Sequence, residues 1–204
     1  MQDRFLDKAY GLETTEDTQN LYRDWAASYD AEIAENGYAT PERVTRALAE
    51  ILKKRDMPVL DFGCGTGLSG LALKLGGFQV IDGMDPNPEM LDLARKKNIY
   101  RNLTLIDIDD EAPVGKGSYG AITAIGVIGT GAAPATTLDL LMNALDPGGL
   151  LAFSLNDHAL ADRQYTGRLN QWLDCGAARL RFQRHGAHLP KQNLEATVYV
   201  LEKA

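Results

Sequence analysis

The chain has 204 residues, of which 45% are apolar and 24% are charged, and its formal net charge is −7 with a pI near 5.0. Such a composition fits one globular core of good size, and the acidic balance argues against general affinity for nucleic acid backbones or anionic membranes. The start, MQDRFLDKAYGLE, carries charges where a signal peptide needs an apolar core, and no apolar run is long enough to cross a bilayer. We therefore expect a cytoplasmic protein with neither a membrane nor a nucleic acid as partner.

The first part of the chain has the pattern of helices. Residues 12–35 carry large apolar side chains four positions apart, which predicts an amphipathic helix. A second helix is expected from Thr40, an N-cap candidate, with Pro41 at its first position. We expect residues 1–56 to form a helical segment that caps the functional site, and residues 57–204 to form the main domain as a single globular unit.

The stretch 58–67, PVLDFGCGTG, predicts a buried strand that ends in a glycine-rich turn. Leu68 then begins a helical repeat of apolar residues that ends at Gly76. In such a turn the missing Cβ atoms let a ligand approach the backbone, and the following helix start offers unpaired N–H groups. This arrangement favours a nucleotide-like cofactor.

The rest of the chain continues as an alternation of strands and helices. Further strands are expected at residues 78–84, 103–106, 119–125 and 150–155, and helices at 89–97, 136–145 and around 165–173. Two last strands, 179–189 and 194–201, are joined by a short link that contains Pro190 and form an antiparallel hairpin. The pattern predicts an α/β fold, a Rossmann-like three-layer sandwich around a mostly parallel seven-stranded sheet, with the C-terminal hairpin antiparallel and a helical segment at the N-terminus.

Two acidic residues end neighbouring strands of this predicted sheet. Asp85 follows the strand after the glycine turn, where a carboxylate can accept two hydrogen bonds from vicinal ribose hydroxyls. Asp107 ends the next strand and can accept one from an adenine amino group. The turn reads GxGxG, and Leu68 stands where the dinucleotide fingerprint needs its third glycine, which weakens the NAD alternative.

The segments VLDFGCGTG, GMDPNPEML and LDPGGLLAFS, at their separations in this chain, resemble class I methyltransferases that use S-adenosylmethionine. The resemblance runs from Leu21 to Lys203. Two more segments, YDAEIAENGYATPERV and ARKKNIYRNL, are most similar to the Williams-Beuren-syndrome-region type of these enzymes.

The resemblance implies a set of cofactor contacts. It places Asp61 and the backbone around Gly63 at the methionine part, Asp85 at the ribose, and a backbone group of Gly126 near the methionine amino group. Tyr29 and Tyr38 are expected to close over the site, although packing in the core is an equal alternative for both tyrosines. For Asp61 a structural role in the turn is the alternative. The full set of expected cofactor contacts is Tyr29, Tyr38, Asp61, Gly63, Cys64, Gly65, Asp85, Pro86, Met90, Asp107, Ile108 and Gly126.

Methyl transfer of this kind is a direct in-line displacement, because the sulfonium of the cofactor is already an activated leaving group. Where the acceptor must lose a proton a base is needed, and His158, after the fifth predicted strand with Asn156 as a polar neighbour, is the candidate. A surface histidine at a helix start is its simpler interpretation. His185 and His188 lie on the predicted hairpin, where we expect them to be exposed.

The leading hypothesis is a methyltransferase for a small-molecule acceptor, working as a monomer or a homodimer. No metal is expected, because Cys64 and Cys175 form no CxxC pair and have no histidine beside them. A binding protein that keeps the cofactor site but has lost the chemistry, and serves as a partner or sensor, is the alternative from another class. An NAD-dependent oxidoreductase is the third hypothesis, which Leu68 argues against.

Overall fold

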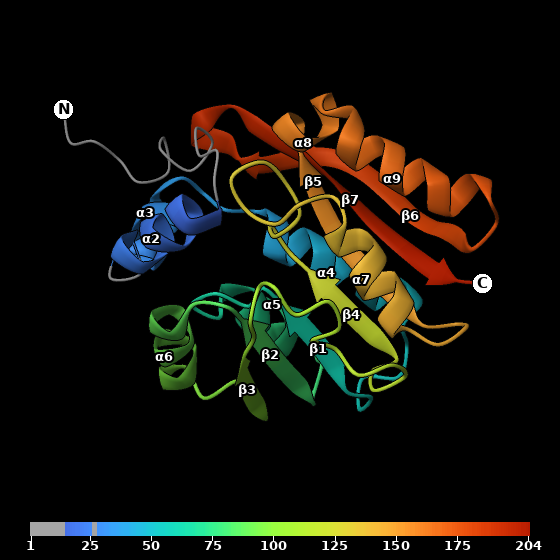
Figure 1. Ribbon diagram of the computed structural model, residues 1–204. Coiled ribbons are helices and arrows are strands. Elements are labelled where there is room, and N and C mark those ends of the chain that lie inside the picture. The colour runs from blue at the N-terminus through green and yellow to red at the C-terminus, as the bar shows by residue number, and fades with distance from the viewer. Residues whose placement is uncertain (1–14, 26–27) are drawn as a thin grey trace.

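The described part of the chain, residues 15–25 and 28–204 of a computed structural model, alternates strands and helices along most of its length (Figure 1). The strands are β1 (Val59–Phe62), β2 (Ile81–Asp85), β3 (Asn102–Leu105), β4 (Ala121–Ala124), β5 (Leu150–Asn156), β6 (Ala178–Leu189) and β7 (Leu194–Lys203). The helices are α2 (Thr15–Trp25), α3 (Tyr29–Glu35), α4 (Thr40–Ile51), α5 (Leu68–Leu75), α6 (Pro88–Lys96), α7 (Thr137–Ala144), α8 (Asp157–Ala161) and α9 (Arg163–Asp174), with a 3₁₀ turn η1 (Pro190–Gln192).

The strands form one sheet in the order β3-β2-β1-β4-β5-β7-β6. The pairs from β3 to β5 are parallel, and β7 runs antiparallel to both β5 and β6. This confirms the predicted Rossmann-like fold with its antiparallel C-terminal hairpin. The chain moves outward from β1 through β2 to β3 and then returns to β4 on the other side of β1. Ligands of such sheets lie beyond the carboxyl ends of the strands at this reversal of strand order.

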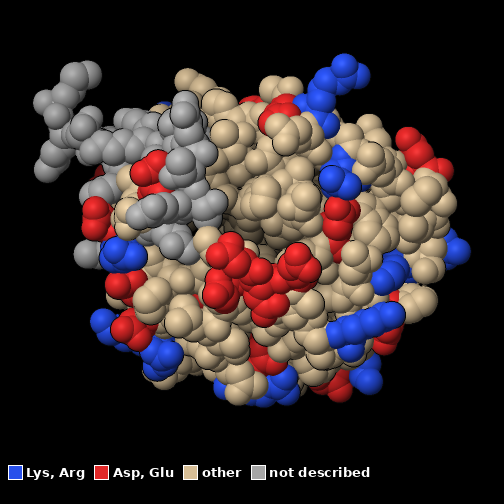
Figure 2. All heavy atoms as spheres, viewed as in Figure 1, with Lys and Arg blue, Asp and Glu red and all other residues tan. Residues whose placement is uncertain are grey.

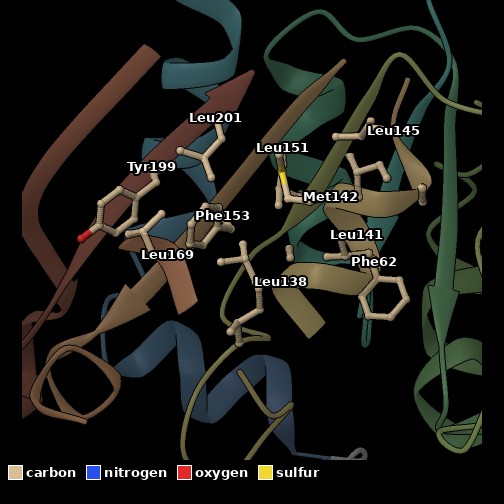
Figure 3. Packing of buried hydrophobic residues seen from close by; sticks show 14 of the residues in the cluster. Phe62, Leu138, Leu141, Met142, Leu145, Leu151, Phe153, Leu169, Tyr199 and Leu201 are labelled. Atoms are coloured by element: carbon tan, nitrogen blue, oxygen red, sulfur yellow. The ribbon is translucent and has the colours of Figure 1, made fainter. Parts of the chain in front are cut away.

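Successive strand residues point to opposite faces, so each face of the sheet has its own apolar core. On one face Leu60, Phe62 and Phe153 pack against α7 and α9, as Figure 3 shows for the largest side chains. Leu138, Leu141 and Met142 of α7 lie over these strand residues. Side chains within the strands are thus used for the two cores. The residues at and after the carboxyl ends of the strands are left to meet a ligand.

The opposite face is covered by α4 and α5. Val44 and Leu48 of α4 and Leu73 of α5 are fully buried against strand residues such as Val59 and Val200. Helix α4 is therefore part of the sheet's core, although the sequence pattern assigned it to the N-terminal segment. The division of the chain near residue 56 stays a prediction.

The two N-terminal helices lie beside the hairpin rather than under the sheet (Figure 1). Trp25 and Ile33 form a buried cluster with Leu189 and Leu194, which flank η1. We expected one helix over residues 12–35, but the structure has α2 and α3 with Ser28 outside both. Residues 12–14 and 26–27 of the expected helix lie outside the described residues.

Element boundaries differ from the predicted ones by a few residues. The second strand was expected over residues 78–84, whereas β2 runs from Ile81 to Asp85, because Phe78 is buried in the preceding loop without joining the sheet. The link with Pro190 is confirmed as the short turn η1. Over residues 15–25 and 28–204, we find no helix whose length and apolar character would let it cross a bilayer.

Candidate active site

The glycine turn after β1 has the conformation that its sequence predicts. Gly63, Gly65 and Gly67 have φ values of 68°, 52° and 93°, which side chains other than glycine rarely adopt. The backbone N–H groups of Gly63 and Cys64 donate to the carbonyl of Met84 at 2.8 and 3.0 Å. These bonds fix the turn against the end of β2.

Asp85, the last residue of β2, is bonded to this turn. One of its carboxylate oxygens accepts the N–H of Gly65 at 2.8 Å and the other accepts the N–H of Asn87 at 2.9 Å. The residue is only 7% exposed, and this burial raises the pKa of the carboxyl to about 6. It makes no ion pair with a lysine or arginine of the described chain. A carboxylate has more lone pairs than these two bonds use, so it can accept further hydrogen bonds from a ligand.

A cavity of about 680 Å³ opens beside Asp85 and the turn. Its volume lies in the range of pockets that hold cofactors. The structure brings nine of the twelve expected contacts to its wall: Tyr29, Gly63, Gly65, Asp85, Pro86, Met90, Asp107, Ile108 and Gly126. We call this space the large cavity. A Cβ added at Gly65 would meet nothing within 4 Å, so the backbone there is open to a ligand.

Asp61 does not line the large cavity. It is fully buried, and its carboxylate accepts hydrogen bonds from the hydroxyls of Ser69 at 2.6 Å, Tyr100 at 2.7 Å and Thr123 at 3.1 Å. Burial raises its pKa to about 6, while the three hydroxyls act in the opposite direction. The geometry corresponds to a support below the turn, the structural alternative that the sequence left open, and not to a ligand contact.

Cys64 is also turned away from the cavity. Its side chain is 3% exposed, and burial raises the pKa of the thiol. A thiol of this kind is a poor nucleophile. The backbone of Cys64 takes part in the turn through its N–H bond to Met84 and through its carbonyl, which accepts the N–H of Gly67 at 2.8 Å.

A second, small cavity of about 50 Å³ lies between the N-terminal helices and the carboxyl ends of β4 and β5. It shares Tyr29, Gly126 and Ala132 with the large cavity, so the two adjoin there. Tyr38, the twelfth expected contact, lines this small cavity and not the large one. Its hydroxyl lies 2.4 Å from where a Cβ of residue 126 would be, which explains a glycine at that position.

The candidate base His158 lies on α8, is exposed, and lines neither cavity. Its neighbour Asn156 does line the small cavity, but its side-chain oxygen accepts the N–H of Ala159 at 3.0 Å and caps α8. The structure therefore gives no support to His158 as a group close to the reacting atoms.

His188 lines the small cavity, which the sequence analysis did not expect. We expected it to be exposed on the hairpin, which is wrong, because it is only 6% exposed and lines the small cavity. Its Nδ1 lies 2.7 Å from Oγ1 of Thr40, which is 148 positions away in the chain. The apolar Leu189 directly after it was the one local sign of burial. His185, by contrast, is about half exposed, as expected.

The outer rim of the large cavity is acidic. Exposed Asp107, Asp109, Asp110 and Glu111 follow β3 and line it. Figure 2 shows acidic side chains grouped in the middle of this face, along the edge of a hollow. Among the described residues, no group of three or more histidine, cysteine or acidic residues is arranged to hold a metal ion. The absence of a metal from the reaction stays a prediction.

A glycine turn open to a ligand and a buried strand-end carboxylate, both at the reversal of strand order in this sheet, define the site of a class I S-adenosylmethionine-dependent methyltransferase. The comparisons agree. Residues 32–198 match the model of the "Methyltransferase domain" family, and the chain belongs to this family. It is thereby a methyltransferase.

Two curated relatives are methyltransferases by name, and only the second name states a substrate. The chain is 28% identical over 169 residues to methyltransferase-like protein 27 of Homo sapiens, covering 81% of this chain and 68% of that protein. This relative agrees with the resemblance to the Williams-Beuren-syndrome-region type. The chain is 37% identical over 70 residues to the 18S rRNA (guanine(1575)-N(7))-methyltransferase of Saccharomyces cerevisiae, covering 34% of this chain and only 26% of that protein.

Among solved structures, the fold is similar to the 1,6-didemethyltoxoflavin-N1-methyltransferase of Burkholderia thailandensis with bound 1,6-didemethyltoxoflavin and S-adenosylhomocysteine. The TM-score is 0.66 at 18% sequence identity, and the match covers 95% of this chain and 92% of that one.

Proposed function

We propose that this chain transfers a methyl group from S-adenosylmethionine to a small-molecule acceptor by direct in-line displacement. The observation that supports binding of this cofactor is the arrangement of Asp85 and the open backbone of Gly65 at one end of the large cavity. The buried carboxylate lacks a cationic partner among the described residues and has acceptor capacity left, which suits the two hydroxyls of a ribose.

In this proposal the cofactor is held by backbone groups of the glycine turn and by side chains at and after the carboxyl ends of β2 and β3. Gly63 and Gly65 lie around its methionine part, Asp85 accepts hydrogen bonds from the ribose, and Pro86 and Met90 flank the adenine. Asp107 and the Ile108 amide meet the adenine edge, and Gly126 lies near the methionine amino group. All of these residues line the large cavity. S-adenosylmethionine would supply a methyl group on a positively charged sulfur, so that no residue has to activate it.

The work left to the chain is to orient the acceptor and keep water out. Trp25 and Ile33 of the N-terminal helices are buried next to the small cavity, and Tyr29 lies between the two cavities. The small cavity adjoins the large one at Gly126, which this proposal puts near the methionine amino group, so these side chains suit a cap over the reacting groups.

A small-molecule acceptor is favoured over an RNA by charge and by size. The rim carries four exposed acidic residues, and the chain has a net charge of −7, both of which repel a phosphate backbone. The small cavity, which adjoins the large one at Gly126, has a volume of only about 50 Å³. The similarity to the yeast rRNA methyltransferase covers only 34% of this chain, so it carries little weight for the acceptor.

Calorimetry with S-adenosylhomocysteine tests the cofactor half. We expect micromolar binding to the wild type and, for Asp85→Ala, a loss of about 1 to 3 kcal/mol, the cost of leaving buried hydroxyls unpaired. Asp56→Ala is the matched control, because this exposed acid precedes β1 at the opposite end of the sheet. Folded wild-type protein that shows no binding at high micromolar concentration would contradict the proposal.

The acceptor half is tested by incubating the protein and S-adenosylmethionine with a library of small metabolites, with total RNA, and with ribosomal proteins. The readout is S-adenosylhomocysteine produced. Turnover confined to the RNA or protein arm would overturn the small-molecule assignment. Turnover in the metabolite arm would also remove the alternative of a binding protein without chemistry.

A further inference from the structure

The small cavity under the N-terminal helices has a buried histidine in its wall, and one of its ring nitrogens makes no hydrogen bond to a described residue. Among the described residues, the imidazole of His188 makes a single side-chain hydrogen bond, from Nδ1 to Thr40, and Nε2 makes none. The residue is only 6% exposed, yet it is part of the cavity wall. Nε2 is not among the fully enclosed polar atoms that lack a partner, so it is open to the cavity and can accept a hydrogen bond from an occupant.

The neighbouring polar groups of the wall are already bonded within the fold. Ser154 Oγ accepts the backbone N–H of Gly126 at 3.0 Å, and Asn156 Oδ1 accepts the N–H of Ala159 at 3.0 Å. The amide nitrogen of Asn156 is a donor only, so of the three residues His188 is the one that offers a nitrogen acceptor with no hydrogen bond to a described residue.

The orientation of the imidazole is fixed from two sides. The ring of Tyr38 meets it edge to face, with 5.3 Å between ring centroids. Thr40 holds Nδ1 from the first turn of α4, and Arg43 of the same helix donates to four backbone carbonyls of the hairpin that carries His188. A side chain held in this way presents the same atom to the cavity each time.

The imidazole is uncharged at neutral pH. Burial and the nearby guanidinium of Arg43 lower the pKa of His188 to about 4. No lysine, arginine, aspartate or glutamate belongs to the described wall of the small cavity. A charged group placed there would lose its hydration without gaining an ion pair, so the cavity disfavours ions of either sign.

From this geometry we infer that the small cavity is the acceptor site, and that it takes a small uncharged compound whose hydroxyl or ring N–H donates a hydrogen bond to Nε2 of His188. The inference rests on the proposed function, since the wall shared at Gly126 is what puts an occupant beside the cofactor. It requires the tautomer in which Nδ1–H donates to Thr40.

Size and wall chemistry narrow the compound further. A cavity of about 150 Å³ is enough to hold benzene, so the volume here, about 50 Å³, admits the reacting group and only part of a ring. The remainder would lie over Tyr29 and Ala132, the shared wall. Trp25, Tyr29 and Tyr38 offer aromatic surface, which suits a flat phenol-like or N-heterocyclic acceptor.

The test uses the full chain with bound S-adenosylhomocysteine and four probes: phenol, anisole, benzylamine and benzoate. Binding is followed by ligand NMR and by the ¹⁵N signals of the His188 imidazole. We expect phenol to bind at least tenfold more tightly than the other three and to shift Nε2. Anisole lacks the donor hydrogen, and the remaining two probes are charged at pH 7.

Two substitutions separate the roles of the ring nitrogens. His188→Asn keeps an amide near the Nδ1 position, bonded to Thr40, but withdraws from the cavity, and it should weaken phenol binding about tenfold. His188→Gln carries an amide to the Nε2 position and should stay within threefold of the wild type. Both variants should bind S-adenosylhomocysteine as the wild type does, which also shows that they are folded.

The inference is overturned if phenol binds no better than anisole or the charged probes, if His188→Asn binds phenol like the wild type, or if Nε2 carries the proton in the free protein. The proposed function fails separately. A protein that binds phenol at His188 but not S-adenosylhomocysteine would refute methyl transfer and leave the phenol site standing.

Discussion

Asp30 on α3 and Lys97, the residue after α6, form an ion pair with 2.7 Å between Oδ2 and Nζ, and both are bonded to Thr66 of the glycine turn. The Thr66 hydroxyl donates to Asp30, and Lys97 Nζ donates to the Thr66 carbonyl at 2.6 Å. Helix α3 is thereby tied to the turn that we assign to the cofactor. Tyr29, next to Asp30, is in the wall of both cavities.

We predict that Asp30→Ala weakens S-adenosylhomocysteine binding without unfolding the protein. The two side chains are 42% and 22% exposed, so the pair itself contributes only up to about 1 kcal/mol, which is at most about a fivefold change in Kd. Calorimetry on Asp30→Ala, Lys97→Met and the double variant gives the coupling energy. Asp92→Ala, which breaks the exposed pair with Arg95 on α6, is the control. Equal effects of Asp30→Ala and Asp92→Ala would disprove the link between α3 and the turn.

A second prediction concerns the support below the turn. Tyr100→Phe removes one of the three hydroxyls bound to the buried Asp61 and also the acceptor for the N–H of Gly70, at 3.1 Å, in α5. Leaving such groups unpaired costs about 1 to 3 kcal/mol of unfolding free energy. Urea denaturation measures it.

Tyr119→Phe is the matched control for this change. The hydroxyl of Tyr119 donates to Asp82 at 3.0 Å, but Asp82 keeps its bonds to Arg101 and Asn102. We expect its effect to be clearly smaller than that of Tyr100→Phe. If the two variants are equally stable, Tyr100 has no special part in holding Asp61.

The strands, the helices and the glycine turn follow from local pattern, and the sequence therefore predicts them well. Apolar alternation and glycine positions act over a few residues, so the turn at Gly63 and the strand-end Asp85 could be found without a structure. Their meeting at 2.8 Å, between Gly65 and Asp85, follows from parallel neighbouring strands.

The wall of the small cavity could not be found in the same way. His188 is buried because α4 lies across the hairpin, and this brings Thr40 to a residue 148 positions later. Asp61 was expected at the ligand, but the hydroxyls that enclose it come from α5, from β4 and from the loop before β3. Contacts between distant segments depend on how elements pack, which no short pattern records.

The glycine turn provides a third prediction with an unusually close control. Gly65 and Gly148 both have positive φ, +52° and +84°, and a Cβ at either would meet nothing within 4 Å. Alanine at each should therefore cost a similar strain of about 1 to 2 kcal/mol in unfolding free energy. Of the two glycines, Gly65 alone faces the large cavity.

We expect Gly65→Ala to weaken S-adenosylhomocysteine binding at least tenfold, because the new methyl group occupies space at the cofactor backbone contact. Gly148→Ala should bind like the wild type. Urea denaturation of both variants measures the backbone strain, and calorimetry measures the loss of binding that the new methyl group causes. Unchanged binding by Gly65→Ala would remove this turn from the cofactor site.

The last prediction uses the pH dependence that burial gives to Asp85. Its pKa is raised from 3.8 to about 6, so between pH 6 and 4 the folded protein holds a proton on Asp85 that the unfolded chain releases. This contribution makes the free energy of unfolding larger as pH falls through that window, by at most about 1.4 kcal/mol per pH unit. Cofactor binding should show the opposite trend, since a protonated carboxyl has fewer lone pairs for ribose hydroxyls. Affinity should fall below pH 6.

Asp85→Asn isolates this residue from the other groups that titrate nearby. Asp61 has a similarly raised pKa, and the lowered pKa of His188 makes the free energy of unfolding smaller as pH falls. Both groups are present in the wild type and in the variant alike. We expect the stability difference between the two proteins to change between pH 7.5 and 4.5, and the variant's weak S-adenosylhomocysteine binding to stay flat over pH 5 to 7.5. A wild-type affinity equally flat over that range would mean that Asp85 does not contact the ribose as a carboxylate.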